Sequence, residues 1–295
     1  MAHVTMHLRP PQEMYSPAIN VSEGCSHGKC LYCSSYRYDK FRPLPDEIVI
    51  SEIEEVAKTA TALTNRIYLT GGNPFGLPTK RLVEIFDSIE ERIPAVRQYG
   101  GFCCIRDIKH KTDEELALLA SRGVDNISIG AESGWDALLE YMDKGQTSAD
   151  IIEQSNRLHS AGIDFTFFYL AGLAGAGRGQ ENAIKSAEIF SEAAPKQILI
   201  VSIVPVPEWP LSEEIESGRW TPPGEEEIAR EIQTFIANLT CPTSVNCSHD
   251  SDIIKFNGMI PKDQENMVKL LDNMIPKMNE KASRRVRELI HGATF

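Results

Sequence analysis

The stretch Cys25-Ser26-His27-Gly28-Lys29-Cys30-Leu31-Tyr32-Cys33 holds three of the chain's seven cysteines and follows an alternating segment, 18–22, that is typical of a strand. Three thiolates on one short loop can hold three irons of a cubane cluster, which leaves the fourth iron open for chemistry. Cys-x-x-Cys is also a zinc spacing, but a structural zinc site needs four ligands, and no further cysteine or adjacent histidine follows at finger-like spacing. The loop therefore favours an iron–sulfur cluster bound by Cys25, Cys30 and Cys33, with zinc as the alternative.

The bulk composition is that of an ordinary globular protein. The chain has 295 residues, of which 42% are hydrophobic and 24% charged, and its length fits one large or two small domains. A formal net charge of −12 argues against nucleic acid as a partner. The longest apolar run, 198–206, is too short to span a membrane, and polar residues between 3 and 9 interrupt any signal-peptide core. An odd number of cysteines, seven, favours reduced thiols and a cytoplasmic location.

Short apolar segments alternate with longer segments of helical periodicity along most of the chain. We expect six strands, at about 18–23, 66–70, 97–104, 126–130, 165–170 and 197–204. Helices are expected to follow from about 46, 79, 112, 135, 148 and 180. Strands that alternate with helices favour parallel βα units, and six right-handed units in a row curl into a partial barrel. The predicted fold class is α/β, a partial (β/α)6 TIM-like barrel with a helical C-terminal extension.

The pattern changes after Trp209. Helices are expected at about 224–239, 262–275 and 277–291, and the segment 241–251 is predicted to be irregular or a short seventh strand. We therefore divide the chain into an extended leader (1–17), a barrel core (18–210) and a mostly helical extension packed on the barrel (211–295). No linker rich in Gly, Ser or Pro separates the last two.

In a parallel barrel the loops after the strands build the active site. The cysteine loop, Gly71–Pro74, Cys103–Asp107, Glu132 and Gly172–Gly177 all follow predicted strands. Loops at the same ends of parallel strands share one rim. The sequence therefore predicts that these segments form one site.

With these loops assembled, the chain resembles the radical S-adenosylmethionine (radical SAM) superfamily from about residue 15 to 240. The usual cysteine spacing of that superfamily is three residues and then two, whereas here four residues separate Cys25 from Cys30. Largely uncharacterised members share the longer loop, and their openings resemble Arg9–Pro11 and Glu23–His27. The resemblance implies one [4Fe–4S] cluster that binds S-adenosylmethionine (SAM). It also implies reductive cleavage of SAM to a 5′-deoxyadenosyl radical, which abstracts hydrogen from a substrate.

Two loops resemble the parts of the superfamily that bind the methionyl and ribose groups of SAM. Gly71-Gly72-Asn73-Pro74 resembles the glycine-glycine-glutamate motif that approaches the methionyl amine, with Asn73 in place of the acid. Glu132 resembles the acid that binds the ribose hydroxyls, and the alternative is an N-cap helper for the helix at Trp135. A simple turn is the alternative for 71–74.

Three further positions resemble cofactor contacts of the superfamily. Arg157 matches an arginine that meets the methionyl carboxylate, and the alternative is a solvated arginine on a helix face. Tyr32 resembles the aromatic residue that borders the adenine. The segment that contains Leu170 and Gly172 resembles the glycine-containing segment that flanks the same ring.

The substrate side offers only candidates. Arg106 and Asp107 follow the third strand, and His249 with Asp250 lies in the irregular C-terminal segment. Arg106 and His249 are the candidate catalytic residues, although isolated residues of these types are more often structural. We expect an unidentified small-molecule or peptide substrate and an electron donor such as flavodoxin or ferredoxin. Neither nucleic acid nor membrane is expected as a partner.

Two alternative functions remain open at this point. The first is a binding or electron-transfer protein whose cluster or zinc is not used on SAM. The second keeps the cofactor but cleaves another bond of SAM, which gives an aminocarboxypropyl radical. The expected number of clusters is one, because Cys103 and Cys104 point to opposite faces of a strand and Cys241 and Cys247 are only a pair. A second cluster held by Cys103 or Cys104 together with Cys241 and Cys247 is the alternative.

Overall fold

The computed structural model describes residues 9–33, 36, 39–205, 209–283 and 285–286, and its chain divides into two compact units. Unit 1 comprises residues 1–28, 35–130 and 156–165, and unit 2 comprises 29–34, 131–155 and 166–295. In the described part of the chain, no helix is long and apolar enough to cross a membrane.

Unit 1 is built on parallel strands in the order β1-β4-β5-β6. They are β1 (Ala18–Asn20), β4 (Arg66–Thr70), β5 (Gln98–Cys103) and β6 (Ile127–Glu132), whose last two residues belong to unit 2. Ile67, Tyr68 and Leu69 of β4 are all fully buried, as expected for a parallel strand covered on both faces. A short antiparallel ribbon, β2 (Ser22–Glu23) with β3 (Arg42–Pro43), stands beside the cysteine loop in sequence.

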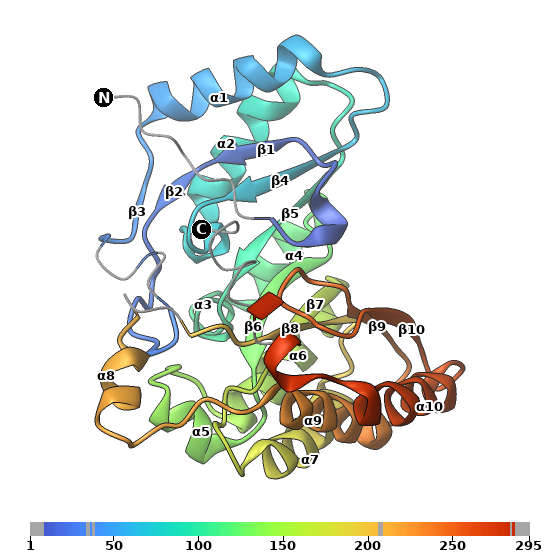
Figure 1. Ribbon diagram of the computed structural model, residues 1–295. Helices are drawn as coiled ribbons and strands as arrows, with labels where there is room; N and C mark the ends of the chain where they lie inside the picture. The colour runs from blue at the N-terminus through green and yellow to red at the C-terminus, as the bar shows by residue number, and fades with distance from the viewer. Residues whose placement is uncertain (1–8, 34–35, 37–38, 206–208, 284, 287–295) are drawn as a thin grey trace. The chain divides into compact units, whose positions relative to one another are not determined.

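The helices of unit 1 cover its strands. They are α1 (Asp46–Thr59), α2 (Thr79–Arg92), α3 (Ile105–Lys109) and α4 (Asp113–Ser121), with single 3-10 turns η1 (Pro11–Glu13) and η2 (Pro74–Gly76). Helices α1 and α2 pack side by side (Figure 1). Thr112 caps α4 through a reciprocal capping box with Glu115, as the sequence predicts.

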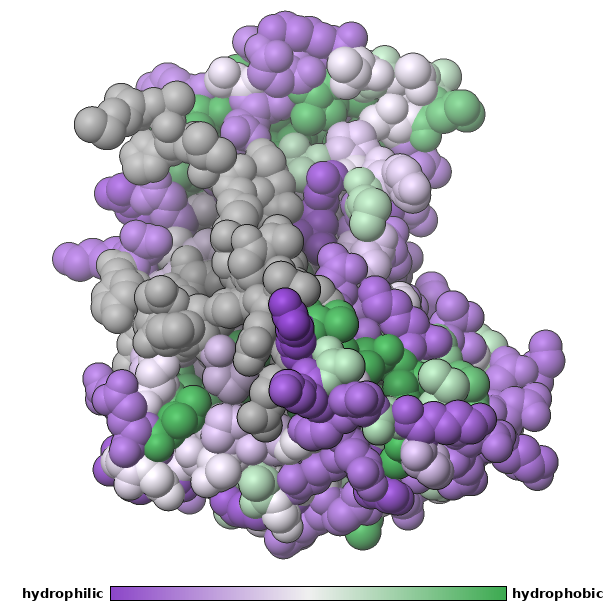
Figure 2. All heavy atoms as spheres, viewed as in Figure 1, coloured by the Kyte–Doolittle hydropathy of each residue, from purple (hydrophilic) through white to green (hydrophobic). Residues whose placement is uncertain are grey.

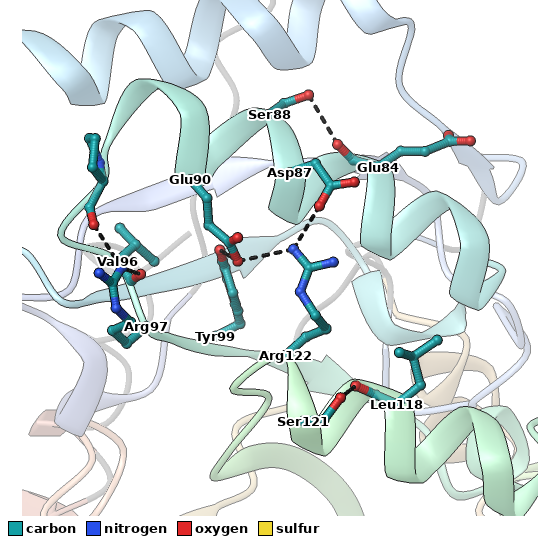
Figure 3. Close-up of polar contacts among 11 residues, drawn as sticks. Glu84, Asp87, Ser88, Glu90, Val96, Arg97, Tyr99, Leu118, Ser121 and Arg122 are labelled. Atoms are coloured by element: carbon teal, nitrogen blue, oxygen red, sulfur yellow. Dashed lines mark hydrogen bonds and ion pairs between the residues drawn. The ribbon is translucent and has the colours of Figure 1, made fainter.

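A polar cluster shown in Figure 3 ties α2 to β5 and to the end of α4. Tyr99 of β5 stacks on Phe86 of α2 with ring centroids 4.0 Å apart, and its hydroxyl donates to Glu90 Oε1 at 3.1 Å. Arg122 donates from one nitrogen to Asp87 (2.7 Å) and Glu90 (3.1 Å). The stacking of Tyr99 on Phe86 and the ion pairs of Arg122 therefore hold helix α2 against β5 and the end of α4.

Unit 2 continues the alternation with β7 (Phe165–Ala171), β8 (Gln197–Ser202), β9 (Thr243–Cys247) and β10 (Phe256–Ile260). The order is β7-β8-β9-β10, parallel except for the last pair. Its helices are α5 (Asp136–Tyr141), α6 (Ser148–Ala161, which runs on into unit 1), α7 (Gly179–Ala193), α8 (Leu211–Glu216), α9 (Glu225–Asn238) and α10 (Gln264–Met274), followed by the 3-10 turn η3 (Ile275–Lys277). Helices α7 and α9 lie side by side (Figure 1). Tyr169 of β7 stacks on Phe235 of α9 with ring centroids 4.0 Å apart.

The six predicted parallel strands are all present, so the α/β fold class is confirmed. The possible seventh strand is β9, which pairs with β8 in parallel. Strand β10 was not predicted, because its edge position leaves Asn257 and Met259 exposed and its Asn-Gly pair is typical of a turn. Helices α3 and α8 are too short to show a period. The helix expected at 277–291 lies in part outside the described residues, and the predicted division at 17 and 210 stays a prediction.

Hydrophilic side chains cover most of the face drawn in Figure 2. Large apolar side chains are exposed at several positions, most of all Tyr15 at 94% and Leu63 at 89%. Single exposed apolar residues are normal for a globular surface. The core is buried elsewhere, on the strands and on the inner helix faces.

Candidate functional site

The three cysteines of the predicted cluster loop are half-buried, and no disulfide involves any of the seven cysteines. By contrast, Cys103, Cys241 and Cys247 are buried, and burial raises the pKa of each of these thiols. Cluster ligands must be thiolates, so accessible cysteines suit that role better than buried thiols do. Among the residues that the structure describes, no three His, Cys, Asp or Glu side chains are arranged to hold a metal ion.

In unit 1 the segment after Cys25 is held by a compact polar network. The amide of Ser26 donates to Asn73 Oδ1 at 2.8 Å, and the Ser26 hydroxyl donates to Asp107 Oδ1 at 2.7 Å. Asn73 Nδ2 donates both to Ser26 Oγ (2.8 Å) and to Asp107 Oδ2. Asn73 is 1% exposed and Asp107 5%. The asparagine predicted to face the methionyl amine is therefore bonded to the cysteine loop itself.

The two glycines before Asn73 are required by close backbone packing. A Cβ at Gly72 would lie 2.1 Å from the Gly24 carbonyl oxygen. Gly71 has a φ of +125°, and a Cβ there would lie 2.2 Å from Ser22 Oγ. Only glycine lets the loop after β4 pass this close to the segment that leads into Cys25. The Gly71-Gly72 pair thus allows the loop after β4 to pack against the backbone that leads into the cysteine loop.

The third loop of unit 1 contributes Arg106 and Asp107. Arg106 Nη1 lies 3.0 Å from Nδ1 of His27, inside the cysteine loop. Asp107 accepts from the amide of Cys104 at 3.1 Å and so starts helix α3. The sequence predicted both residues to border the site, and the structure brings them to the residues that follow Cys25.

Arg157 is bonded around the end of helix α3. Its Nε donates to Asp113 Oδ1 at 2.7 Å, and its terminal nitrogens donate to the carbonyl oxygens of Ile108 and Lys111. Carbonyls at a helix C-terminus favour a cation. These contacts describe a helix-capping arginine, and its role toward the methionyl carboxylate stays a prediction.

In unit 2 the Cys30–Cys33 turn is anchored by its backbone. Cys33 donates its amide to the Cys30 carbonyl at 3.3 Å, and Leu31 donates to the Met142 carbonyl at 3.1 Å. Leu211 in turn donates to the Leu31 carbonyl at 2.9 Å. The segment therefore forms a short turn fixed between α5 and α8.

The predicted adenine contacts meet in one apolar cluster of unit 2. The buried members of this cluster are Tyr32, Trp135, Leu138, Met142, Leu170, Leu173, Ala174, Ile203, Leu211 and Trp220. Gly172 has a φ of +85°, and a Cβ there would lie 2.8 Å from Ile203. The structure thus places Tyr32 and the segment at Leu170–Leu173 together, as the resemblance implies.

Glu132 lies beside this cluster with Lys144, which the sequence analysis missed. Lys144 Nζ is 3.4 Å from Glu132 Oε1 and 5.8 Å from the Tyr32 ring centroid, and both side chains of the ion pair are largely buried. Burial raises the pKa of Glu132, and Lys144 counteracts the rise. Glu132 also has a left-handed φ of +66°. Helix α5 starts at Asp136 with Trp135 at its N-cap position, and the amide of Trp135 donates to the Ser133 hydroxyl at 3.0 Å. The choice between a ribose ligand and an N-cap helper for Glu132 stays a prediction.

The Tyr32 hydroxyl has no hydrogen-bond partner of good geometry although it is buried. The neighbouring Cys30 thiol, a weak hydrogen-bonding group, is close enough to act on its pKa, which burial raises well above the usual value. Burial also raises the pKa of the Cys30 thiol, while Lys144 lowers it. The buried Tyr32 hydroxyl thus lies close to the thiols of Cys30 and Cys33 in unit 2. The donor chemistry of the loop therefore fits a cluster and its bound cofactor.

His249 belongs to a polar group at the carboxyl end of β8. Its ring Nδ1 accepts from the Ser251 amide at 3.2 Å and lies 2.8 Å from the Ser251 hydroxyl. Asp252, 3% exposed, accepts from the His249 amide at 3.0 Å and from the Ser202 hydroxyl at 2.9 Å. Burial raises the pKa of Asp252 to about 6 and lowers that of His249. The exposed Asp250, also a candidate, instead pairs with Lys255 at 3.6 Å.

The family model of the radical SAM superfamily matches residues 19–175, more than half of the chain. That range includes the cysteine loop, Gly71–Pro74, Glu132 and Gly172. The chain belongs to the radical SAM superfamily. This confirms the predicted family and the prediction that the protein is an enzyme.

Two curated relatives are heme chaperones named HemW. The protein from Lactococcus lactis subsp. lactis (strain IL1403) is 25% identical over 181 residues, which is 61% of this chain and 47% of the relative. The one from Bacillus subtilis (strain 168) is 24% identical over 144 residues, 48% of this chain and 38% of the relative. The chain therefore spans less than half the length of these relatives.

Solved structures show the same fold at low identity. Methylornithine synthase (PylB) gives a TM-score of 0.54 at 15% identity and covers 91% of this chain and 84% of PylB. Elp3 of Methanocaldococcus infernus gives 0.54 at 17% over 89% of this chain and 63% of Elp3. TsrM of Kitasatospora setae gives 0.54 at 17% over 68% of this chain and 36% of TsrM, and its structures contain cobalamin, a [4Fe–4S] cluster and a SAM analogue. These matches support the predicted partial-barrel fold.

Proposed function

We propose that this chain binds one [4Fe–4S] cluster through Cys25, Cys30 and Cys33 and cleaves SAM reductively. When bound, the cluster and SAM would supply a 5′-deoxyadenosyl radical that abstracts hydrogen from a substrate. The observation that carries the proposal is the superfamily match over residues 19–175, which includes all three cysteines. The half-buried state of these thiols, against the buried Cys103, Cys241 and Cys247, supports the assignment of the ligands.

The chain's own residues have separate tasks in this proposal. Tyr32, Leu170 and Gly172 border the adenine, because they meet in one apolar cluster. Glu132 accepts hydrogen bonds from the ribose hydroxyls, and the ion pair with Lys144 holds its carboxylate in place. Trp135 and its apolar neighbours exclude water from this face.

The proposal is tested with anaerobically reconstituted protein, dithionite and SAM. Formation of 5′-deoxyadenosine and methionine is the expected result. Formation of methylthioadenosine would instead support cleavage to an aminocarboxypropyl radical. Absence of both products from protein that carries a full cluster would favour a binding or electron-transfer protein. A triple variant with all three loop cysteines changed to alanine is the matched control.

Heme handling is a second candidate, favoured by the similarity to two heme chaperones. The matched segments are less than half of either relative, so the proposal is limited to heme binding. Titration with heme should give a saturable shift of the Soret band if the chain binds heme. A spectrum that equals the sum of free heme and protein would exclude this candidate.

The remaining assignments concern partners and location. We propose a flavodoxin or ferredoxin as electron donor, a small-molecule or peptide substrate, and a cytoplasmic location. The odd number of cysteines, seven, favours reduced thiols and supports the last of these. Arg106 and His249 remain the candidate catalytic residues on the substrate side.

A further inference from the structure

Glu231 is a fully buried carboxylate on α9, outside the segment that matches the family model. Its Oε1 accepts from the Tyr169 hydroxyl at 2.7 Å and from Asn182 Nδ2 at 2.8 Å. Its Oε2 accepts from the amide of Gly172 at 3.0 Å. The carboxylate thus holds the first residue of the loop after β7, which is one of the predicted SAM-binding segments.

The same network reaches the loop after β6. Asn182 Oδ1 accepts from the Ser133 hydroxyl at 2.6 Å and from the Ser186 hydroxyl at 3.1 Å. The Ser133 hydroxyl accepts from the amide of Trp135 at 3.0 Å, and the Ser186 hydroxyl accepts from the amide of Gly134 at 2.8 Å. Ser133 directly follows Glu132, the predicted ribose ligand. One hydrogen-bonded chain therefore joins Glu231 to both loops.

The start of helix α7 packs closely against the Glu231 carboxylate. A Cβ at Gly179, the first residue of α7, would lie 2.7 Å from Glu231 Oε2. Burial raises the pKa of Glu231 to about 7, and the neighbouring Glu227 adds to the rise, whereas the bonds from Tyr169, Asn182 and Gly172 oppose it. Burial of a carboxylate costs free energy, and buried polar groups with such a cost are often found in functional regions.

We propose that Glu231 is a positioning residue that fixes the loop at Gly172 and the loop at Ser133–Trp135 in one arrangement and thereby sets the affinity for SAM. This inference rests on the proposed function for the identity of the ligand. The coupling of the two loops does not depend on it, because every contact in the network lies within unit 2. Glu231 itself need not touch the cofactor.

The coupling is tested by amide hydrogen exchange on the protein without cluster or SAM. Glu231→Gln keeps the size of the side chain but cannot accept at both ends, so exchange should rise at 131–136 and at 170–175. Ser133→Ala removes the bond to Asn182 and should raise exchange at 131–136 alone. Glu226→Gln is the matched control, because Glu226 lies on the same helix and its exposed carboxylate pairs with Arg230 at the surface. The control should leave both segments unchanged.

The second measurement is the dissociation constant for SAM in the anaerobically reconstituted protein. Glu231→Gln should raise it about tenfold and Ser133→Ala by a smaller factor, while Glu226→Gln should leave it within twofold. A purely structural role predicts faster exchange throughout unit 2 and a lower melting temperature. A positioning role predicts a change confined to the two segments.

Three results would overturn the inference. The first is unchanged exchange at both segments in Glu231→Gln, and the second is a rise spread over the whole of unit 2. The third is a local rise in exchange with an unchanged SAM dissociation constant. A wild-type protein that holds a cluster but binds no SAM would refute the proposed function and the ligand named here, whereas the exchange data would still decide the coupling.

Discussion

Units 1 and 2 each contain a hydrogen-bonded network that fixes a loop of the predicted site, and the two networks use different chemical groups. The network of unit 1 holds the cysteine loop, and the network of unit 2 holds the loop at Gly172. In unit 1 the amide of Asn73 accepts from the Ser26 backbone and donates to the Asp107 carboxylate. In unit 2 the Glu231 carboxylate only accepts, from Tyr169, Asn182 and Gly172. Both networks are buried, and both join residues far apart in sequence.

The difference lies in what each network depends on. A neutral amide donates and accepts at any pH, so the contacts of Asn73 do not require that Asn73 itself be ionised. A carboxylate that accepts three hydrogen bonds loses acceptor capacity when it is protonated. The loop at Gly172 is therefore linked to a titration and the link between Asn73 and Ser26 is not, and each prediction below tests this contrast or the ligands that the two networks serve.

The largest effect is expected from the loop cysteines. Cys25→Ala, Cys30→Ala and Cys33→Ala should each abolish the broad visible absorbance of the reconstituted cluster, because two thiolates leave two irons without protein ligands. Wild-type protein should contain about four irons per chain. Iron analysis and absorbance after anaerobic reconstitution measure both quantities.

Cys241→Ala is the control for this series, since its thiol is buried and donates to the Phe190 carbonyl at 3.7 Å. It should keep a full cluster. If Cys25→Ala also keeps one, the longer loop does not ligate as proposed. An iron content of about eight per chain in wild type that falls in Cys241→Ala or Cys247→Ala would instead indicate a second cluster.

The next largest effect concerns the pH dependence of stability. The pKa of Glu231 rises from 4.5 to about 7 on folding, so the folded state favours the protonated carboxyl. The resulting contribution to the free energy of unfolding is fully present below pH 4.5 and is lost as the pH rises through 7. The change amounts to about 3 kcal/mol over that window. The free energy of unfolding, measured with urea between pH 4.5 and 8, should fall more steeply in wild type than in Glu231→Gln.

Asp252 titrates in a similar way, with a pKa raised from 3.8 to about 6, but both proteins retain it. The difference between their curves therefore isolates Glu231. Parallel curves for the two proteins would show that Glu231 does not titrate in this range, and the contrast between the two networks would then disappear.

The strands were predictable because their signal is local. The run Arg66–Thr70 is apolar, bounded by polar residues and followed by Gly-Gly, and it forms β4. Thr112 and Glu115 form the capping box that their spacing indicates. Strand β10 gives no such signal, because its stability comes from pairing with β9 rather than from its own sequence.

The candidate site was predictable only where a residue belongs to a motif. Tyr32 and Leu170 were identified by resemblance, and they meet in one cluster. Lys144 and Glu231 were missed, because each acts through a partner that is distant in sequence and carries no pattern of its own. Asn73 was assigned by its place in a motif, whereas its hydrogen bonds to Ser26 depend on tertiary packing.

Removal of the Glu132 carboxylate should act on SAM affinity more than on the fold. A hydrogen bond to a charged group contributes about 1.5–3 kcal/mol, so Glu132→Ala should raise the SAM dissociation constant roughly ten- to a hundredfold. The measurement is equilibrium binding to reconstituted protein, with melting recorded in parallel. Glu140→Ala, at an exposed position of α5, is the control.

Loss of Glu132 also removes the ion pair of the largely buried Lys144, which lowers stability. Lys144→Met separates the two effects, because it removes the ion pair and keeps the carboxylate. If Glu132→Ala and Lys144→Met weaken SAM binding equally, the ion pair rather than a ribose contact explains the effect. Unchanged affinity in Glu132→Ala would remove Glu132 from the cofactor site.

The smallest effect is expected at Asn73, and it decides what the neutral network of unit 1 does. Asn73→Ala removes the bonds to Ser26 and Asp107 and should cost about 1–2 kcal/mol of unfolding free energy. Asn238→Ala, at an exposed site on α9, is the control and should change little. Because Asn73 is bonded to the cysteine loop, its loss should slow cluster assembly while SAM affinity, measured on protein with a full cluster, changes less than about threefold. The opposite result, normal assembly with a tenfold loss of SAM affinity, would show that Asn73 binds the methionyl amine as the resemblance implies.

Asn73→Asp sharpens the choice, since it places a second carboxylate against Asp107 and should be less stable than Asn73→Ala at about pH 8, where like charges repel. A stable Asn73→Asp with stronger SAM binding would instead show that the position faces the cofactor amine.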